Sequence, residues 1–387
     1  MINAHIERSG EDDEGVSQTV EARGLPTFLS EASLASWPSN TLTNSRQSLE
    51  GRCDRRVLIV GGYGKAGLKT AEHLATGGLV SEITIAGRSG EHAAKAAARI
   101  ARSSRVCVLG QGLDILHDDA AEHALSLHDI VIMTTEANLE RVAAHVARLG
   151  KTMISIAAGA ACNGALDKLA SSADATGALL VSETGLAPGL MTVLAKELVR
   201  CGALGELHIV LTLDLIGRHG EEAIAWTLAQ LRAAAGFVRS PRGEKLYPVD
   251  FADNSAMAAR LGLDTASAYL ALRPDLPAID LASIARHLKG REGGLEALSA
   301  ATATIVKVFG LSTDRVRLDV TISNDSTVRK AVFQGRDQSN LTGAIAARAA
   351  EIALDCQLTG SKRMDDLLAF SDADALLSRL GASIELR

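Results

Sequence analysis

Three glycines with a fixed spacing are the residues of this sequence whose chemistry is simplest to state. Gly62, Gly64 and Gly67 lie in the turn Gly62-Tyr63-Gly64-Lys65-Ala66-Gly67. Glycine allows a tight turn and lets the backbone approach a diphosphate closely. Where such a turn opens a helix, the N–H groups and the dipole of the helix stabilise the negative charge. The pattern is common, so its meaning depends on the segments around it.

The segments on both sides of the glycines have the patterns that a dinucleotide-binding turn requires, a buried strand before it and a helix after it. Residues 57–60, Val-Leu-Ile-Val, are a continuous apolar run, as expected of a parallel strand buried on both faces. Residues 65–76 carry apolar side chains on one side and are followed by Gly77 and Gly78, a typical helix end. This context predicts a dinucleotide site, and the alternative is a strand–helix turn that is merely rich in glycine.

The side chains at the end of the next predicted strand favour NADP(H) over NAD(H). Enzymes that use NAD place an acidic residue about 20 residues after the glycines, on the ribose 2′-hydroxyl. Residues 83–89 read Ile-Thr-Ile-Ala-Gly-Arg-Ser and contain no acid. The guanidinium of Arg88 and the hydroxyl of Ser89 suit a 2′-phosphate in charge and geometry. A solvated arginine in a surface loop is the alternative.

Polar residues after later strands are further candidates for the cofactor site. Asp114 follows the third predicted strand, where its carboxylate could accept a hydrogen bond from the adenine amine. Thr134 and Thr135 end the fourth, at the carboxyl edge where ligands of open α/β sheets lie. Each of the three could instead cap a helix.

The glycine turn opens a regular alternation of strands and helices. Strands are predicted at residues 57–60, 83–86, 105–109, 130–133, 153–156 and 179–182, and helices at 65–76, 91–102, 118–127, 139–149, 167–174 and 188–200. This order predicts an α/β fold with a Rossmann-type, doubly wound parallel sheet. Residues 206–215 and 315–322 alternate apolar and polar side chains and predict a second α+β domain with a mixed or antiparallel sheet.

These patterns suggest how the chain is divided. Residues 1–52 carry eight acids and four arginines and lack apolar periodicity, which predicts a mobile acidic tail. We expect an NADP-binding Rossmann domain at residues 53–203 and a substrate and dimerisation domain at 204–335. Residues 336–387 are then C-terminal helices, the first of which, at 339–358, returns to the Rossmann domain, before a polar terminal segment.

Composition excludes several classes of function. A net charge of -6 argues against binding to nucleic acid. The five cysteines form no close pair, so neither a metal site nor a disulfide framework is expected, which favours a cytoplasmic setting. No stretch approaches the roughly 20 apolar residues of a membrane span. We expect a cytoplasmic protein with a small-molecule substrate, and a homodimer because one sheet face of the second domain is open.

The chain from about residue 55 to 370 resembles the saccharopine dehydrogenase-like (saccharopine reductase-like) family of NADP-dependent oxidoreductases. The matching segments are the glycine turn, Ala-Gly-Arg-Ser at residues 86–89, and Glu183-Thr184-Gly185-Leu186-Ala187-Pro188-Gly189, which is similar to the family's Glu-x-Gly-Leu-x-Pro-Gly. The resemblance implies a second domain inserted into the dinucleotide fold. It also implies that NADPH reduces the C=N bond of an imine.

Residues 183–189 suit the substrate side of such a reaction. Gly185 and Gly189 permit a sharp backbone path, Pro188 starts a helix, and the positive end of that helix favours a carboxylate. Glu183 is therefore a candidate catalytic residue, and Gly185, Leu186, Pro188 and Gly189 are candidate substrate-binding residues. A helix-start loop without a ligand is the alternative.

Departures from the family pattern argue against saccharopine itself as substrate. Ala187 stands where saccharopine reductases have Asp, and residues 190–192 read Leu-Met-Thr instead of an Ile-Asp-His type of sequence. Residues 154–159 lack the expected Tyr. A smaller or less polar imine is favoured.

A loop of the second domain offers the other catalytic candidate. His219 titrates near neutral pH and Arg218 could bind a substrate carboxylate. A solvated loop histidine is the alternative, and a protonated iminium accepts hydride without a general acid. Lys245 and Tyr247 are weaker candidates. Reduction of a C=C bond, as by enoyl reductases of the family, and a non-catalytic NADP(H)-sensing protein remain the alternative functions.

Overall fold

The computed structural model describes residues 55–115, 118–157, 159–214, 221–234, 236–251, 253–273 and 314–387. By their contacts, residues 52–387 form one compact unit, to which every element below belongs. Arg218, His219 and the predicted tail lie outside the described residues.

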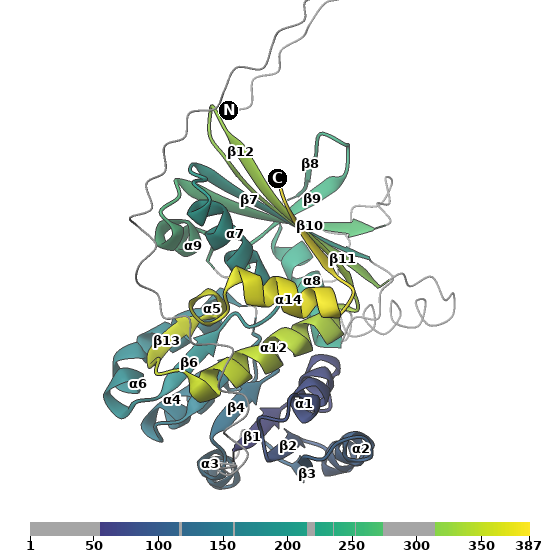
Figure 1. Ribbon diagram of the computed structural model, residues 1–387, viewed down its shortest axis with the longest axis vertical. Coiled ribbons are helices and arrows are strands. Elements are labelled where there is room, and N and C mark those ends of the chain that lie inside the picture. Colours follow the sequence, from purple (N-terminus) through teal and green to yellow (C-terminus); the bar gives the residue numbers. More distant parts are fainter. Residues whose placement is uncertain are drawn as a thin grey trace, which may run out of the picture. The chain divides into compact units, whose positions relative to one another are not determined.

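The first sheet is all parallel, with the strand order β13-β6-β5-β4-β1-β2-β3 (Figure 1). Its strands are β1 (Arg56–Val60), β2 (Glu82–Gly87), β3 (Cys107–Gly112), β4 (Ile130–Met133), β5 (Thr152–Ser155), β6 (Leu179–Ser182) and β13 (Gly360–Arg363). The order reverses at β1, which lies between β4 and β2, and in such sheets ligands bind at the carboxyl ends beside this reversal. The predicted Rossmann-type sheet is confirmed.

Helices cover both faces of this sheet. They are α1 (Lys65–Gly77), α2 (Gly90–Ala101), α3 (Asp118–Leu127), α4 (Leu139–Arg148), α5 (Ala160–Lys168), α6 (Ala170–Thr176) and α12 (Gln338–Asp355). Alternate residues of β1 point to opposite sides: Val57 and Ile59 pack in the core under α1, α2 and α12, whereas Leu58 and Val60 pack in the core under α3 and α4. A strand buried on both faces therefore needs a continuous apolar run.

The second sheet is mixed, with the order β14-β12-β11-β7-β10-β9-β8. Its strands are β7 (Glu206–Asp214), β8 (Val238–Arg239), β9 (Lys245–Val249), β10 (Thr265–Arg273), β11 (Arg315–Ser323), β12 (Val328–Arg336) and β14 (Ser383–Leu386). β7 runs parallel to β10 and antiparallel to β11. Leu207, Ile209, Leu211 and Leu213 of β7 are buried on one face, as the alternation predicted.

Helices of four to 13 residues accompany the second sheet in the part of the chain that the structure describes. They are α7 (Leu190–Arg200), α8 (Glu221–Ala233), α9 (Asn254–Leu261), α13 (Met364–Leu367) and α14 (Phe370–Arg379). α7 follows the Glu183–Gly189 loop and packs against β11 and β12, so it connects the first sheet to the core of the second. No described helix is long and apolar enough to cross a membrane.

The chain after α12 departs most from the sequence-based expectation of a polar end. β13 joins the first sheet beside β6, and β14 joins the second beside β12. β13 reads Gly-Ser-Lys-Arg, so it lacks the apolar pattern by which buried strands are identified. The predicted helix at residues 167–174 is also wrong in extent, because α5 and α6 divide this part of the chain.

Candidate functional site

The glycine turn connects β1 to α1 and is packed too tightly for side chains. A Cβ on Gly67 would lie 2.6 Å from the carbonyl oxygen of Gly61, and a Cβ on Gly62 would lie 2.8 Å from that of Ile59. The N–H groups of Gly61 and Gly62 both donate to the carbonyl oxygen of Ala86 on β2, at 2.9 and 3.1 Å. The turn is thereby fixed at the end of β1, where the strand order reverses.

The first turn of α1 presents a positive helix end without a side-chain cap. Gly64 is the N-cap residue and makes no capping hydrogen bond, and the first turn contains no acidic residue. A helix begins with N–H groups that lack intrahelical acceptors, and its dipole favours an anion there. The geometry of residues 62–67 therefore fits a diphosphate group.

The threonines after β4 support the turn. The hydroxyl of Thr134 donates to the carbonyl oxygen of Val60 at 2.8 Å, and a Cβ on Gly67 would lie 2.9 Å from this hydroxyl. Thr135 Oγ1 accepts a hydrogen bond from the N–H of Ala137 at 3.3 Å. Thr134 thus shapes the glycine turn from beneath, and a direct contact of either threonine with a cofactor stays a prediction.

The structure brings Tyr63 to the end of β2, beside Arg88 and Ser89. The Tyr63 hydroxyl accepts a hydrogen bond from the N–H of Ser89 at 3.2 Å, and a Cβ on Gly87 would lie 2.4 Å from the Tyr63 ring. Ser89 Oγ caps α2 by accepting from the N–H of His92 at 3.3 Å. Arg88 is exposed and forms no ion pair or hydrogen bond with the described residues, so its guanidinium is available to a phosphate.

A neighbouring hollow was not expected from the sequence. It measures about 360 Å³ between α1 and α2 and is bordered by Tyr63, Leu68, His92, Lys95, Ala96 and Arg99. The rings of Tyr63 and His92 meet edge to face, with centroids 5.7 Å apart. Asp114, half-buried after β3, is the remaining predicted cofactor residue on this side of the turn, and its role is untested.

The segment from Glu183 to Gly189 forms a tight loop between β6 and α7. Glu183 has a φ of 60°, and Gly189 a φ of 128°, where a Cβ would lie 2.2 Å from the carbonyl oxygen of Glu183. Thr184 fixes the loop to β5, because its hydroxyl donates to the carbonyl oxygen of Ser155 at 2.8 Å. Leu186 points into the core of the second sheet, and Pro188 is buried.

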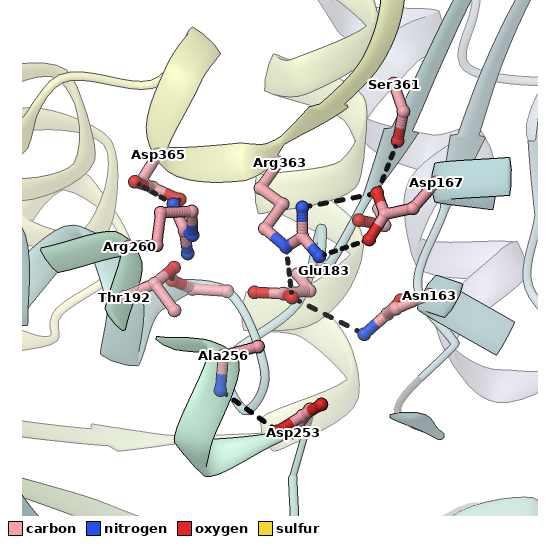
Figure 2. Close-up of polar contacts among 12 residues, drawn as sticks. Asn163, Asp167, Glu183, Thr192, Asp253, Ala256, Arg260, Ser361, Arg363 and Asp365 are labelled. Atoms are coloured by element: carbon pink, nitrogen blue, oxygen red, sulfur yellow. Dashed lines mark hydrogen bonds and ion pairs between the residues drawn. The ribbon is translucent and has the colours of Figure 1, made fainter. Parts of the chain in front are cut away.

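The Glu183 carboxylate is buried and only half satisfied (Figure 2). Its Oε1 accepts hydrogen bonds from Arg363 Nε at 3.0 Å and Asn163 Nδ2 at 3.4 Å. Its Oε2 has no hydrogen-bond partner among the described residues. Burial raises the pKa of Glu183, and the nearby guanidinium groups of Arg363 and Arg260 offset only part of this effect.

Two further ion pairs surround this carboxylate. Arg363 Nη2 donates to Asp167 on α5 at 2.8 Å, and Asp167 also accepts from the Ser361 hydroxyl at 2.9 Å. Arg260 Nη1, from α9, donates to both oxygens of Asp365 at 2.8 and 2.7 Å. A cavity of about 110 Å³ lies among these groups, lined by Glu183, Ala256, Met257, Arg260 and Arg363.

The residues around Glu183 were not identified from the sequence. Arg363 is 180 positions away and lies on a polar strand without an apolar pattern. Asn163, Asp167, Arg260 and Asp365 are likewise ordinary polar residues of helices, and no local motif marks them. The weaker candidates Lys245 and Tyr247 are buried in the second sheet's core beside Phe237. The described residues contain no group of three or more His, Cys, Asp or Glu side chains that could hold a metal.

Comparisons with known proteins give no family. No protein-family model matches the sequence, and no curated protein matches it. Among solved structures, the amine dehydrogenase from Mycobacterium smegmatis is similar with 12% identity and a TM-score of 0.45, over 82% of this chain and 96% of that chain. Biliverdin reductase from Synechocystis, in complex with biliverdin and NADP+, has 14% identity and a TM-score of 0.42, over 85% and 96% of the two chains.

A third similar structure is GenD2 from gentamicin A biosynthesis in complex with NAD, with 15% identity and a TM-score of 0.41, over 87% and 97% of the two chains. Identities and TM-scores of this size are too low to bear on the function of this chain. The resemblance to saccharopine reductases is not shown by these comparisons and stays a hypothesis.

Proposed function

We propose that this chain is an NADP(H)-dependent oxidoreductase that reduces the C=N bond of an imine, or oxidises the corresponding amine, of a small amino-acid-like metabolite. The observation that carries the proposal is the uncapped glycine turn at the strand-order reversal of an all-parallel sheet. A Cβ on Gly62 or Gly67 would lie under 3.0 Å from backbone oxygens of this part of the chain, so the tight path that brings the backbone to the start of α1 needs glycine at both positions.

The glycine turn, Arg88, Ser89 and Asp114 each have a separate task on this account. Residues 62–67 hold the diphosphate at the start of α1, and Asp114 accepts a hydrogen bond from the adenine. Arg88 pairs with the 2′-phosphate through charge and fork geometry. Because the Ser89 hydroxyl caps α2, its contribution to the phosphate comes from the positive end of that helix. When bound, NADPH supplies the hydride.

The substrate side lies at the loop between β6 and α7. The buried side chains of Leu186 and Pro188 anchor this loop. They thereby hold Glu183, Gly185 and Gly189 in place. When Glu183 is protonated, its proton lies on Oε2, the carboxyl oxygen that has no hydrogen-bond partner among the described residues. Arg218 and His219 remain proposals for substrate contact and proton transfer, and they lie outside the described residues.

Turnover with paired substrates tests the reaction. The full chain should oxidise NADPH when an amine and a 2-oxo acid are supplied together, and it should release a secondary or primary amine detectable by mass spectrometry. Binding of NADPH without oxidation over a broad panel of such pairs would contradict the reaction and favour a sensing protein. Oxidation with conjugated enoyl substrates alone would instead favour the C=C reductase alternative.

A further inference from the structure

The cavity beside Glu183 has hydrogen-bonding groups in its wall that the protein leaves unused. Glu183 is 2% exposed, and its Oε2 has no partner among the described residues. Arg260 contacts Asp365 through Nη1 alone, so its Nε and Nη2 donors are not used by any described residue. Leaving the buried Oε2 of Glu183 without a partner is costly, and a bound polar group would recover that free energy. Arg260 is an exposed residue, so its unused donors can meet a ligand that enters from solvent.

The groups around the cavity come from separate elements. Figure 2 shows Arg260 to the left of Glu183 and Arg363 above it, with Asp365 beside Arg260 and Asp167 to the right of Arg363. Arg260 lies on α9, which packs in the second sheet's core, whereas Glu183 directly follows β6 and Arg363 ends β13 of the first sheet. A ligand in the cavity would therefore contact both parts of the chain.

The available donors select the class of ligand. Arg260 offers N–H donors, and protonated Glu183 offers an O–H donor from Oε2 because Oε1 already accepts from Arg363 and Asn163. A carboxylate has two acceptor oxygens and no competing donor, and guanidinium–carboxylate hydrogen bonds are strong. An ammonium group would instead meet the two guanidinium groups that line the cavity.

We propose that this cavity is the subsite for a carboxylate of the substrate, with Arg260 and the protonated Glu183 as its two anchors. The inference rests on the proposed function and names the substrate class: an oxo acid or amino acid. Glu183, a candidate catalytic residue from the sequence, binds the substrate on this account. The α9 residue Arg260 then decides which substrates are accepted.

The proposal includes a dependence on pH. Glu183 donates to a carboxylate when protonated and repels it when ionised, so binding strengthens as the pH falls. The other charged groups that act on Glu183 are Arg363 on β13, Arg260 on α9 and Asp365 on α13. Two more charged groups pair with these: Asp167 on α5 with Arg363, and Lys196 on α7 with Asp365, at 3.5 Å between Nζ and Oδ2. Glu183→Gln isolates the contribution of Glu183 because it removes the titrating proton and keeps a donor.

Calorimetric titration of the full chain with succinate, and with neutral succinamide as control ligand, tests the subsite. Wild-type protein should bind succinate, more tightly at lower pH, and should not bind succinamide. Arg260→Gln alone leaves the buried Asp365 without its main partner, so the paired variant Arg260→Gln with Asp365→Asn is used. It should bind succinate about tenfold more weakly or worse, as expected for the loss of a charged hydrogen bond.

Two further variants complete the test. Glu183→Gln should keep succinate binding and lose its pH dependence, and Arg242→Gln, which removes an exposed arginine from a distant turn, should behave as wild type. Equal binding by the paired variant and the wild type would overturn the subsite, and so would no succinate binding by a protein that still binds NADPH. Absence of NADPH binding, measured in the same preparations, would count against the proposed function alone.

Discussion

At the scale of single residues, Glu183 is the group whose surroundings are least expected for a carboxyl side chain. Ionised carboxylates are seldom fully buried unless they are paired, because removal from water is costly. Arg363 and Asn163 satisfy one oxygen of Glu183 and leave the other without a described partner. The balance raises the pKa of Glu183, which is a shift toward the protonated form that the proposed substrate site requires.

The raised pKa of Glu183 predicts how this residue affects the free energy of unfolding. The folded-state pKa of Glu183 is raised above its unfolded value, so the folded protein retains the proton more firmly. The contribution of Glu183 is therefore fully present below the unfolded pKa and is lost as the pH rises through the folded pKa. The free energy of unfolding of wild type, measured in urea relative to Glu183→Gln, should fall as the pH increases over that range. A difference that rises with pH would contradict the assignment.

At the scale of elements, the continuously apolar strands of the first sheet were predictable, whereas the polar β13 and the mixed β10 were not. The runs at β4 and β6 matched their predicted residues, because strands buried on both faces must be continuously apolar. β13 is short and polar, and only its pairing with β6 makes it a strand. The glycine turn could be identified from spacing, whereas the contact of Arg363 with Glu183 depends on that unpredicted strand.

The packing of α12 on α1 gives a prediction at this scale (Figure 1). A Cβ on Gly343 of α12 would lie 2.7 Å from the backbone nitrogen of Thr70 and 2.6 Å from the Cβ of Lys69, neither of which can move without shifting α1. We expect Gly343→Ala to cost about 1–3 kcal/mol in urea unfolding, as overpacking does.

Gly164→Ala is the matched control for this helix contact. Gly164 lies in α5, and a Cβ there would meet no atom within 4 Å. Because alanine favours a helix over glycine, this change should leave stability unchanged or raise it by up to about 1 kcal/mol. Equal losses in both variants would show that the α1–α12 contact is not as close as described.

At the scale of the whole molecule, the end of the chain contributes to both sheets. β13 extends the first sheet and β14 the second, and α7 leads from one sheet into the core of the other. Residues 52–387 accordingly form one compact unit. We therefore expect the two sheets to unfold together.

Asp319 of the second sheet provides the test of joint unfolding. Burial alone would raise the pKa of Asp319, but hydrogen bonds from Arg317 and Lys330 outweigh it and lower the pKa. Asp319→Asn should cost about 1–3 kcal/mol at neutral pH, the range for a hydrogen bond to a charged group. The difference from wild type should shrink as the pH falls through the folded pKa, because the contribution of Asp319 is then lost.

Two probes should show the unfolding transition of Asp319→Asn at the same urea concentration, which is lower than that of the wild type. Trp226 of α8 stacks on Phe251, with ring centroids 5.4 Å apart. In a Trp37→Phe background, Trp226 is the single tryptophan, and its fluorescence follows the second sheet's core. Circular dichroism follows the helices, and most of the described helices cover the first sheet. A shift of the fluorescence transition without the dichroism transition would mean that the sheets unfold separately.

The central claim, that the glycine turn with Arg88 holds NADP(H), is tested most directly by titrating NADPH and NADH into wild type and Arg88→Asp. Loss of the guanidinium–phosphate pair should weaken NADPH binding by about ten- to a hundredfold and leave NADH binding within a few-fold. Arg102→Asp, an exposed arginine at the other end of α2, is the matched control and should change neither affinity. Equal losses for the two cofactors in Arg88→Asp, or no binding of NADPH by the wild type, would contradict the account.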